Sequence, residues 1–414
     1  MALSGNGADN NPPQRPASEA SPQSKGALLQ RTTVRVGKYS RRIIETPSRN
    51  GESMHRRSTF LAVVILALWS TLPLPLLAAE RYDVTSLPFL PFSNTGGEAL
   101  NNNGMVAGGI GNSDGSVSVA EWSKGALTNL GVPPGVPSHE FNRPRVFGIN
   151  DSGAIVGTLH TSAGETPSRS FIYNRGRFTI LPLVDPTDLG GAAIGINNKD
   201  EVVGYDRTSS HNVKGWLWSN GAYSTLPVSG ADTAALGINS SGTIIGNRTL
   251  NLIQRLLAGQ FCCGGERGYV VSHGATQYLS GFVYAINDLG EAAGGSTSAG
   301  NALATVFRNG SATVIVSLPS SAVGINSSGS VIGSYQPAGS NRRHLFIWSA
   351  NSGAYDLTPD GYRSAEAAAI NNRGEILGFG ETRTGTSQYF LLTPAADGVL
   401  TPKKLITSPA AGAP

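Results

Sequence analysis

A short pattern of apolar and polar positions recurs seven times along the chain. Each copy has an apolar residue, an asparagine, two variable residues, a glycine in all copies but one, and a short stretch that ends in a second glycine, as in GINSSGTIIG. Successive asparagines are 39 to 49 residues apart. Self-similarity at a nearly constant period predicts a repeat architecture. The seven copies are Ala99–Gly108, Gly148–Gly157, Gly195–Gly204, Gly237–Gly246, Ala285–Gly294, Gly324–Gly333 and Ala369–Gly378.

Each copy predicts a tight β-hairpin. An asparagine at the first turn position can cap its own turn with a side-chain hydrogen bond, and a glycine three residues later can take a left-handed conformation. The third copy has Asp200 in place of this glycine. Aspartate tolerates a positive φ better than most residues, so we expect the same turn there.

Two further strands follow in most repeats. An aromatic or β-branched residue precedes a second glycine turn, as in VKGWLWSNG, and a last strand ends near Leu-Pro, as at Phe178–Pro182 and Tyr223–Pro227. Four strands in about 45 residues are typical of one propeller blade. We therefore predict an all-β fold, a seven-bladed β-propeller of four-stranded antiparallel blades. The alternative is a right-handed β-helix in which two coils make up each repeat.

The recurring core resembles the extracellular HAF-repeat family of bacteria. The resemblance rests on the seven asparagine–glycine cores and covers residues 82–395. The nearest match to the triplet that names the family is His344-Leu345-Phe346, and the other repeats lack the histidine. The resemblance implies a secreted protein with a repetitive β architecture, and it implies no defined activity.

Composition also favours short strands over helices, and the charge argues against nucleic acid. Glycine makes up 53 of 414 residues and only 14% are charged, against about 7% and about 25% in ordinary proteins. Residues 1–79 hold ten basic and four acidic residues, whereas the rest of the chain holds 21 and 23. The repeat region therefore lacks the positive surface that phosphate backbones require, and we expect no nucleic-acid partner.

The N-terminal region contains a candidate export signal that starts at Met54. Arg56 and Arg57 precede an apolar stretch at Phe60–Trp69, and Leu77-Ala78-Ala79 approximates a cleavage site. This pattern predicts export to the extracellular space, the periplasm or the cell envelope. The alternative is an uncleaved membrane anchor that ends at Leu77, a span that two prolines interrupt.

These assignments divide the chain into four parts. We predict a disordered or mis-assigned extension over residues 1–53 and a signal peptide over residues 54–79. The propeller is expected over residues 80–406 and a disordered tail over residues 407–414. We expect contact with a membrane only through the signal, if it is not cleaved.

The strand order predicts two unlike faces. If strands A to D of each blade run antiparallel from the axis outward, the A–B and C–D turns share one face, which we call the turn face. The opposite loop face carries the connections of variable length, which are either recognition loops or tolerated insertions. These connections are residues 109–116, 158–168, 205–212, 247–266, 295–301, 334–343 and 379–387. The candidate binding residues on this face are Tyr205, Asp206, Arg207, His211, Arg342 and Arg343.

The longest connection contains the two cysteines of the chain, Cys262 and Cys263. Adjacent cysteines in an exported protein can form a vicinal disulfide, stay reduced or link two molecules. A loop staple is favoured over a redox-active pair because the chain has no CxxC spacing. The pair offers too few ligands for a metal site, and we expect no metal or cofactor.

The sequence gives little support for catalysis. His139, His160 and His211 could share the loop face, but none lies in an HExxH or GxSxG context. Asp206, Arg207 and His211 are close in sequence, and we expect them on a surface loop. We therefore predict a secreted or envelope-associated, monomeric, non-enzymatic scaffold that binds glycan or protein. The alternative is an extracellular polysaccharide hydrolase or lyase.

The two ends of the repeat region raise the question of how the ring closes. Tyr82–Leu87 has the character of a D strand but precedes the first A strand, and Gly398–Ile406 is a further D candidate. We predict that Tyr82–Leu87 pairs with the last C strand at Gln388–Leu392, which leaves Gly398–Ile406 outside or as a tail. The alternative is a local hairpin through Ala395–Gly398, which costs less loop-closure entropy.

Overall fold

The structure is a computed structural model that describes residues 81–89, 98–134, 143–160, 168–229, 232–248, 267–298 and 300–405. All of them belong to one compact unit, Leu77–Pro414. The extension predicted over residues 1–53, the signal over 54–79 and the tail over 407–414 lie outside the described residues. Within the described ranges, no helix is long and apolar enough to cross a membrane.

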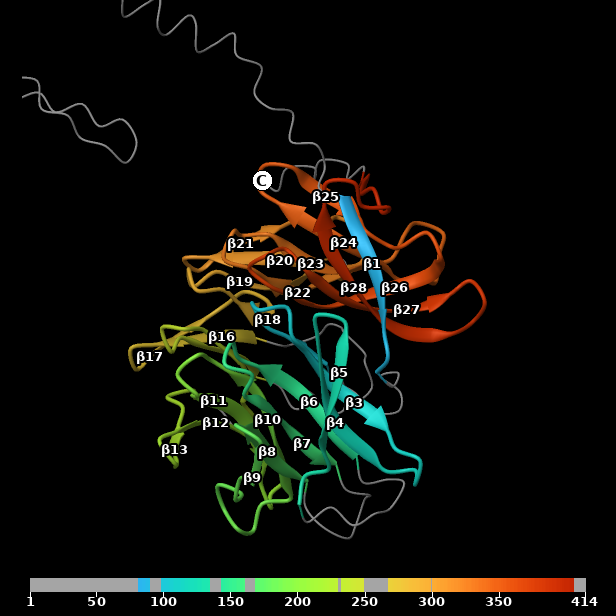
Figure 1. Cartoon of the computed structure of the whole chain (residues 1–414). Coiled ribbons are helices and arrows are strands. Elements are labelled where there is room, and N and C mark those ends of the chain that lie inside the picture. The colour runs from blue at the N-terminus through green and yellow to red at the C-terminus, as the bar shows by residue number, and fades with distance from the viewer. Residues whose placement is uncertain are drawn as a thin grey trace, which may run out of the picture. The chain divides into compact units, whose positions relative to one another are not determined.

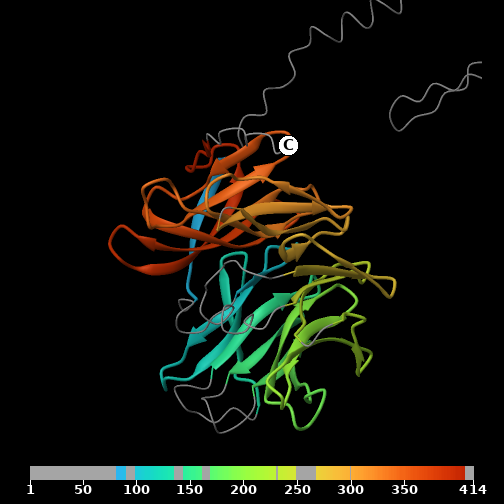
Figure 2. The same ribbon diagram turned by 180° about the vertical axis from the view of Figure 1, so that it is seen from behind.

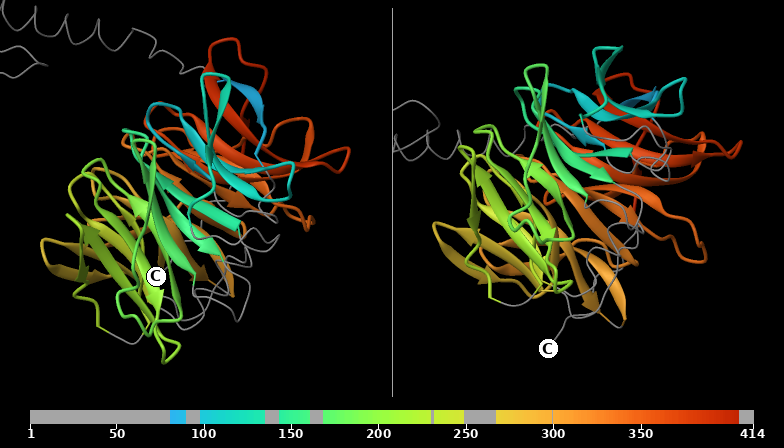
Figure 3. Two further views of the ribbon diagram at one scale, coloured as in Figure 1. Left: turned by 60° about the horizontal axis from the view of Figure 1, so that its bottom comes forward. Right: turned by 90° about the horizontal axis from the view of Figure 1, so that it is seen from below.

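Seven antiparallel sheets surround a common axis (Figures 1 and 3). The predicted seven-bladed β-propeller is therefore confirmed, and the β-helix alternative is wrong. In each blade the innermost strand leads into the asparagine turn, and the second strand contains the short apolar stretch that follows it. The sequence motif thus builds the two strands nearest the axis.

The strand bounds follow blade by blade from the axis outward. Blades one to three contain β2 (Ala99–Leu100), β3 (Val106–Gly111), β4 (Val117–Ser123) and β5 (Ala126–Gly131); β6 (Arg143–Ile149), β7 (Ile155–His160), β8 (Arg169–Asn174) and β9 (Arg177–Ile180); and β10 (Gly190–Ile196), β11 (Val202–Arg207), β12 (Val213–Ser219) and β13 (Ala222–Thr225). Blades four and five contain β14 (Ala234–Ile238), β15 (Ile244–Arg248), β16 (Arg267–Ser272) and β17 (Ala275–Tyr278); and β18 (Phe282–Ile286), β19 (Ala292–Ser298), β20 (Asn301–Arg308) and β21 (Ser311–Val314). Blades six and seven contain β22 (Ser320–Ile325), β23 (Val331–Tyr335), β24 (His344–Ser349), β25 (Gly353–Asp356) and β29 (Lys403–Lys404); and β26 (Tyr362–Ile370), β27 (Ile376–Thr382), β28 (Ser387–Ala395) and β1 (Arg81–Leu87).

The ring closes through its N-terminal strand. Strand β1 pairs with β28 as the outermost strand of blade seven, with Val84 opposite Leu392 and Leu87 opposite Tyr389. In Figures 1 and 2 it is the blue strand among the red ones. Tyr82 is only 2% exposed, so the pairing buries apolar surface as well as backbone. The predicted closure is confirmed, and the local-hairpin alternative is wrong.

The C-terminal segment lies outside the closed ring, as predicted. Leu400 exchanges two backbone hydrogen bonds of 2.9 and 3.0 Å with Tyr82 on the outer side of β1. Strand β29 then pairs with β25 and becomes a fifth strand of blade six. The segment therefore joins the outer edges of the last two blades.

The second glycine of the motif brings the second and third strands of a blade close together. At Gly246 a Cβ atom would overlap both the carbonyl oxygen of Ala234 and the hydroxyl of Tyr269. Glycine leaves room for an aromatic ring from the neighbouring strand. The same arrangement recurs where Gly157 meets Phe171, Gly204 meets Trp216, Gly333 meets Phe346 and Gly378 meets Phe390.

The innermost strands also carry apolar side chains that pack together. Six inner strands contain a register shift just before the asparagine turn, which re-aims one residue. Phe147, Ile194, Leu236 and Tyr284, from blades two to five, pack into one cluster with buried neighbours. These four residues lie on the innermost strands, so the inner edges of blades two to five carry apolar side chains as well as the polar turns.

Candidate functional site on the turn face

The seven asparagines cap their own turns. At Asn326, for example, Oδ1 accepts hydrogen bonds from the backbone N–H groups of Ser328 and Ser330 at 3.1 and 3.0 Å. All seven side chains are 3–5% exposed. The fourth turn residue has φ between 61° and 87° in every repeat, and Asp200 has the lowest value. The predicted turn, including the aspartate exception, is confirmed.

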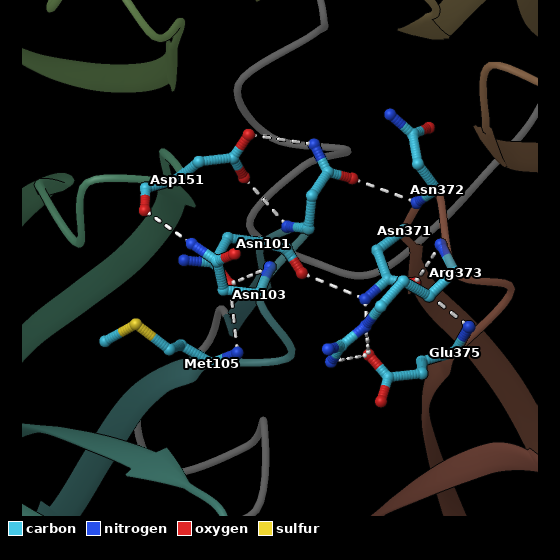
Figure 4. A network of polar contacts seen from close by, with 9 residues as sticks. Asn101, Asn103, Met105, Asp151, Asn371, Asn372, Arg373 and Glu375 are labelled. Atoms are coloured by element: carbon cyan, nitrogen blue, oxygen red, sulfur yellow. Dashed lines mark hydrogen bonds and ion pairs between the residues drawn. The ribbon is translucent and has the colours of Figure 1, made fainter.

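The same asparagines also join the blades into a closed ring. Each Nδ2 group donates to the backbone oxygen of the asparagine in the next blade, at 2.9–3.2 Å. The last bond runs from Asn371 to Asn101 and crosses the ring closure (Figure 4). Every neighbouring pair of blades is thus linked at its inner edge. The members are Asn101, Asn150, Asn197, Asn239, Asn287, Asn326 and Asn371.

A second, more exposed set of bonds lies beside the asparagine ring. The residue after each asparagine faces its equivalent in the next blade, and in five pairs the backbone N–H donates to the neighbour's side chain at 2.9 Å. Asp151, for example, accepts from Asn102 and donates to Asn198. These contacts hold the polar side chains around the axis in fixed orientations (Figure 4). The set comprises Asn102, Asp151, Asn198, Ser240, Asp288, Ser327 and Asn372.

The two sets of residues surround a cavity of about 230 Å³ on the axis. Amide, hydroxyl and carboxylate groups line it, together with the aliphatic residue that precedes each asparagine. Asp151 and Asp288 are its charged lining residues, and no lysine, arginine or histidine is among them. A cavity with this lining repels anions and can bind a neutral or cationic polar group.

The structure places the predicted loop-face residues differently from the sequence analysis. Tyr205, Asp206 and Arg207 form the end of β11, so the expectation that they lie on a surface loop is wrong. Asp206 is 2% exposed and accepts hydrogen bonds from Trp216 Nε1 at 2.9 Å and from the Val184 N–H at 2.7 Å. Burial raises the pKa of its carboxyl group. Asp206 therefore has a structural role inside blade three.

The other candidates do not converge with Asp206. Tyr205 is buried beside Arg145, and burial raises the pKa of its hydroxyl to about 12. Arg207 and His211 are exposed, and His211 has a φ of 67° in the turn between β11 and β12. Two different blades therefore supply the six predicted residues.

Arg342 and Arg343 lie in the connection just before β24, as the sequence analysis expected. Arg342 is exposed, whereas Arg343 lies 3.7 Å from the carboxylate of Glu366 in the next blade. Cys262, Cys263 and His139 lie outside the described residues, as does the side chain of His160. Over the described part of the chain, no three histidine, cysteine, aspartate or glutamate side chains group as metal ligands do.

Sequence analysis missed one titratable cluster, in blade six. His344 Nδ1 lies 2.8 Å from Asp356 Oδ2, and the Tyr335 hydroxyl donates to the same oxygen at 2.8 Å. The three side chains come from the neighbouring ends of β23, β24 and β25, and their hydrogen bonds link these three strand ends. The histidine of the HAF-like triplet and an aspartate twelve residues later were the available signal. The asparagine ring was missed as well, because its bonds join residues 39 to 270 positions apart.

Comparison with known proteins finds likeness at the level of structure only. No known protein family matches the chain, and no curated protein matches it. A puromycin-hydrolysing peptidase from Mycobacterium tuberculosis matches with a TM-score of 0.49 and 12% identity, over 80% of this chain and 54% of that chain. The β-propeller domain of the Trilobed protease from Pyrococcus furiosus matches with a TM-score of 0.46 and 10% identity, over 80% of this chain and 100% of that chain. TolB from Acinetobacter baumannii matches with a TM-score of 0.38 and 15% identity, over 72% of this chain and 81% of that chain.

The chain spans about half the length of the peptidase it matches. At 10–15% identity these likenesses concern the β-propeller fold, and they say nothing of what this chain does.

Proposed function

We propose that this protein is a secreted or envelope-associated, HAF-repeat-like scaffold that binds a glycan or a protein without chemical conversion. The observation that carries the proposal is the closed ring of seven asparagine bonds around a polar axial cavity. Such a ring holds amide, hydroxyl and carboxylate groups in place before a ligand arrives, which lowers the entropic cost of binding.

The surroundings of the titratable groups support binding over catalysis. A hydrolase or lyase at the channel would need a carboxylate or histidine that can exchange a proton with the substrate. The inner strands of blades two to five pack apolar side chains together, and the carboxylates of the axial cavity, Asp151 and Asp288, each accept a hydrogen bond from a neighbouring turn. Asp206, the carboxylate that the sequence suggested for this purpose, is buried and accepts hydrogen bonds from Trp216 of its own blade and from Val184 in the connection before that blade.

Two parallel screens of the full chain test the proposal. A glycan array and a capture experiment with extracellular proteins should give a saturable ligand. A screen of polysaccharides, analysed for new reducing ends or unsaturated products, should give no turnover. Turnover that depends on the folded protein would contradict the proposal and favour the hydrolase or lyase alternative.

A further inference from the structure

A second cavity, of about 290 Å³, opens on the turn face between blades four and five. The asparagine turns of both blades form one side of it, and the turns between their third and fourth strands form the other. Asn239 and Asp288 line both this cavity and the axial one. The two cavities are therefore neighbours that share a wall, and every lining residue is among those the structure describes.

A short side chain in blade four leaves this space open. Thr243 is the residue four positions after the asparagine, where four other repeats have the longer Met105, Glu201, Glu291 and Glu375 and two have the small Ala154 and Ser330. In blade five the equivalent residue is Glu291, and its long side chain forms an ion pair with the long side chain of Arg308. The hydroxyl of Thr243 lies 3.1 Å from that of Ser241 and 3.3 Å from that of Ser272.

An exposed leucine stands at the edge of the same cavity. Leu289 is 70% exposed and occupies the turn position that is polar or charged in the other six repeats. The inner wall of the cavity includes Leu279 and Phe307, which are buried. The cavity thus combines the exposed side chain of Leu289 with the hydroxyl groups of Thr243 and Ser272.

We propose that the two adjoining cavities form one site that binds a short, neutral oligosaccharide. This inference rests on the proposed binding function and names its ligand class. Each cavity is equivalent to about eight to ten liquid water molecules in volume, which is room for one sugar ring. A shared wall lets two linked rings occupy both.

The lining groups match the chemistry of a neutral sugar. Each sugar hydroxyl both donates and accepts a hydrogen bond, and so do the amide of Gln277, the amide of Asn309 and the hydroxyl of Ser272. The C–H face of a sugar ring can pack against the exposed side chain of Leu289. No lysine, arginine or histidine lines either cavity, whereas Asp288 lines both. Sugars that carry carboxylate or sulfate groups should therefore bind more weakly.

Calorimetric titration of the full-length protein tests the inference. The probes are neutral di- and trisaccharides and their uronic-acid counterparts, and the site variants are Gln277→Ala and Leu289→Asp. Both variants should weaken binding of the neutral probes at least tenfold without changing the melting temperature. The matched control is Leu189→Asp on the loop face, where the leucine is 42% exposed, and it should bind as the wild type does.

A charge variant tests the selectivity separately. Asp288→Asn keeps an oxygen that can accept from Ser240 but removes the negative charge. It should narrow the difference in affinity between neutral and uronic-acid probes by several fold. Glycan binding that none of these variants changes, or binding of a peptide in place of a glycan, would overturn this inference and leave the proposed binding function standing. Cleavage of the probe would overturn the proposed function itself.

Discussion

At the scale of single residues, the asparagine of each repeat has two separate roles. Its Oδ1 atom accepts from two backbone N–H groups of its own turn, and its Nδ2 group donates to the next blade. Both ends of the amide are thus used, and the backbone oxygen accepts in turn from the preceding blade. No other side chain of this length provides a donor and an acceptor in this geometry.

Removal of one amide should therefore destabilise the whole ring. Asn326→Ala deletes the bond to Asn371 and removes the acceptor of the Ser328 and Ser330 N–H groups in the turn. We expect a loss of about 2 to 4 kcal/mol in the free energy of unfolding, measured with urea. The control is Ser328→Ala in the same turn, whose hydroxyl bonds the same Oδ1 atom, and it should cost about 0.5 kcal/mol or less. Equal losses in both variants would refute the role of the ring.

A buried glutamate predicts an unusual dependence of stability on pH. Oε1 of Glu98 is buried and has no hydrogen-bond partner among the described residues. Burial raises the pKa of this carboxyl well above its ordinary value of 4.5, while a hydrogen bond from Tyr389 lowers it. The folded protein thus keeps a proton that the unfolded chain loses, so stability falls as the pH rises above about 4.5.

Glu98→Gln removes this proton linkage while keeping the shape of the side chain. The variant should gain stability over the wild type as the pH rises from 4 to 7, and the difference should vanish at low pH. Urea unfolding at a series of pH values measures it. A difference that stays constant over this range would contradict the account.

At the scale of strands, the blade that closes the ring is the one built from both ends of the chain. Tyr82 and Leu87 on β1 are buried against blade seven, and Leu400 from the other terminus bonds to the outer side of the same strand. A propeller without β1 would expose the edge of β28. Such an edge is a site of both instability and aggregation.

Deletion of residues 80–90 should therefore destabilise the whole disc. We expect the melting temperature to fall by about 10 °C or more, since a buried strand of seven residues is lost. A truncation after residue 402 removes β29 but leaves the ring closed, and it should cost only a few degrees. Similar shifts for both deletions would show that β1 does not close the ring.

Sequence patterns predicted the strands better than the contacts between blades. The turn that Asn326 caps, and the tolerance of Asp200 in the same turn, could be predicted because the motif of ten residues contains all the groups involved. The likeness of Tyr82–Leu87 to the D strands of the repeats, and its position before the first A strand, were enough to assign this strand to the last blade. The bonds between blades and the cavity beside Thr243 could not be predicted, because they depend on which side chains meet across repeats.

The same limit explains the error at Asp206. In that segment a strand continues farther toward the loop face than its polar sequence suggests, and Trp216 and Val184 satisfy the carboxylate there. The sequence analysis therefore assigned Asp206 to the surface because it is charged, although its side chain is buried and bonds to Trp216.

At the scale of the whole molecule, the two faces differ in how they are held. The turn face is linked by hydrogen bonds from blade to blade around the full circle. Before the longest loop-face connection, β15 is anchored near its end, since the fully buried amide of Asn247 exchanges two hydrogen bonds of 2.9 Å with Val283. The sequence-based boundary of this loop at Asn247 is therefore wrong.

This anchor predicts where the loop can be removed. Replacement of residues 250–265 by a short glycine–serine linker should keep the melting temperature within about 2 °C of the wild type, because long loops contribute little to stability. A replacement that begins at Asn247 should lower it by several degrees more. Differential scanning calorimetry of both variants measures this, and equal melting temperatures would show that the Asn247 bonds are dispensable.

The central claim is that the rigid turn face holds a neutral glycan and leaves it intact. A crystal structure of the protein with the neutral oligosaccharide that binds best in solution tests this most directly. The account predicts an uncleaved ligand that spans both cavities, with one sugar ring against Leu289 and Gln277 and hydroxyl groups near Asp288. A ligand on the loop face, or a cleaved product at any site, would contradict it.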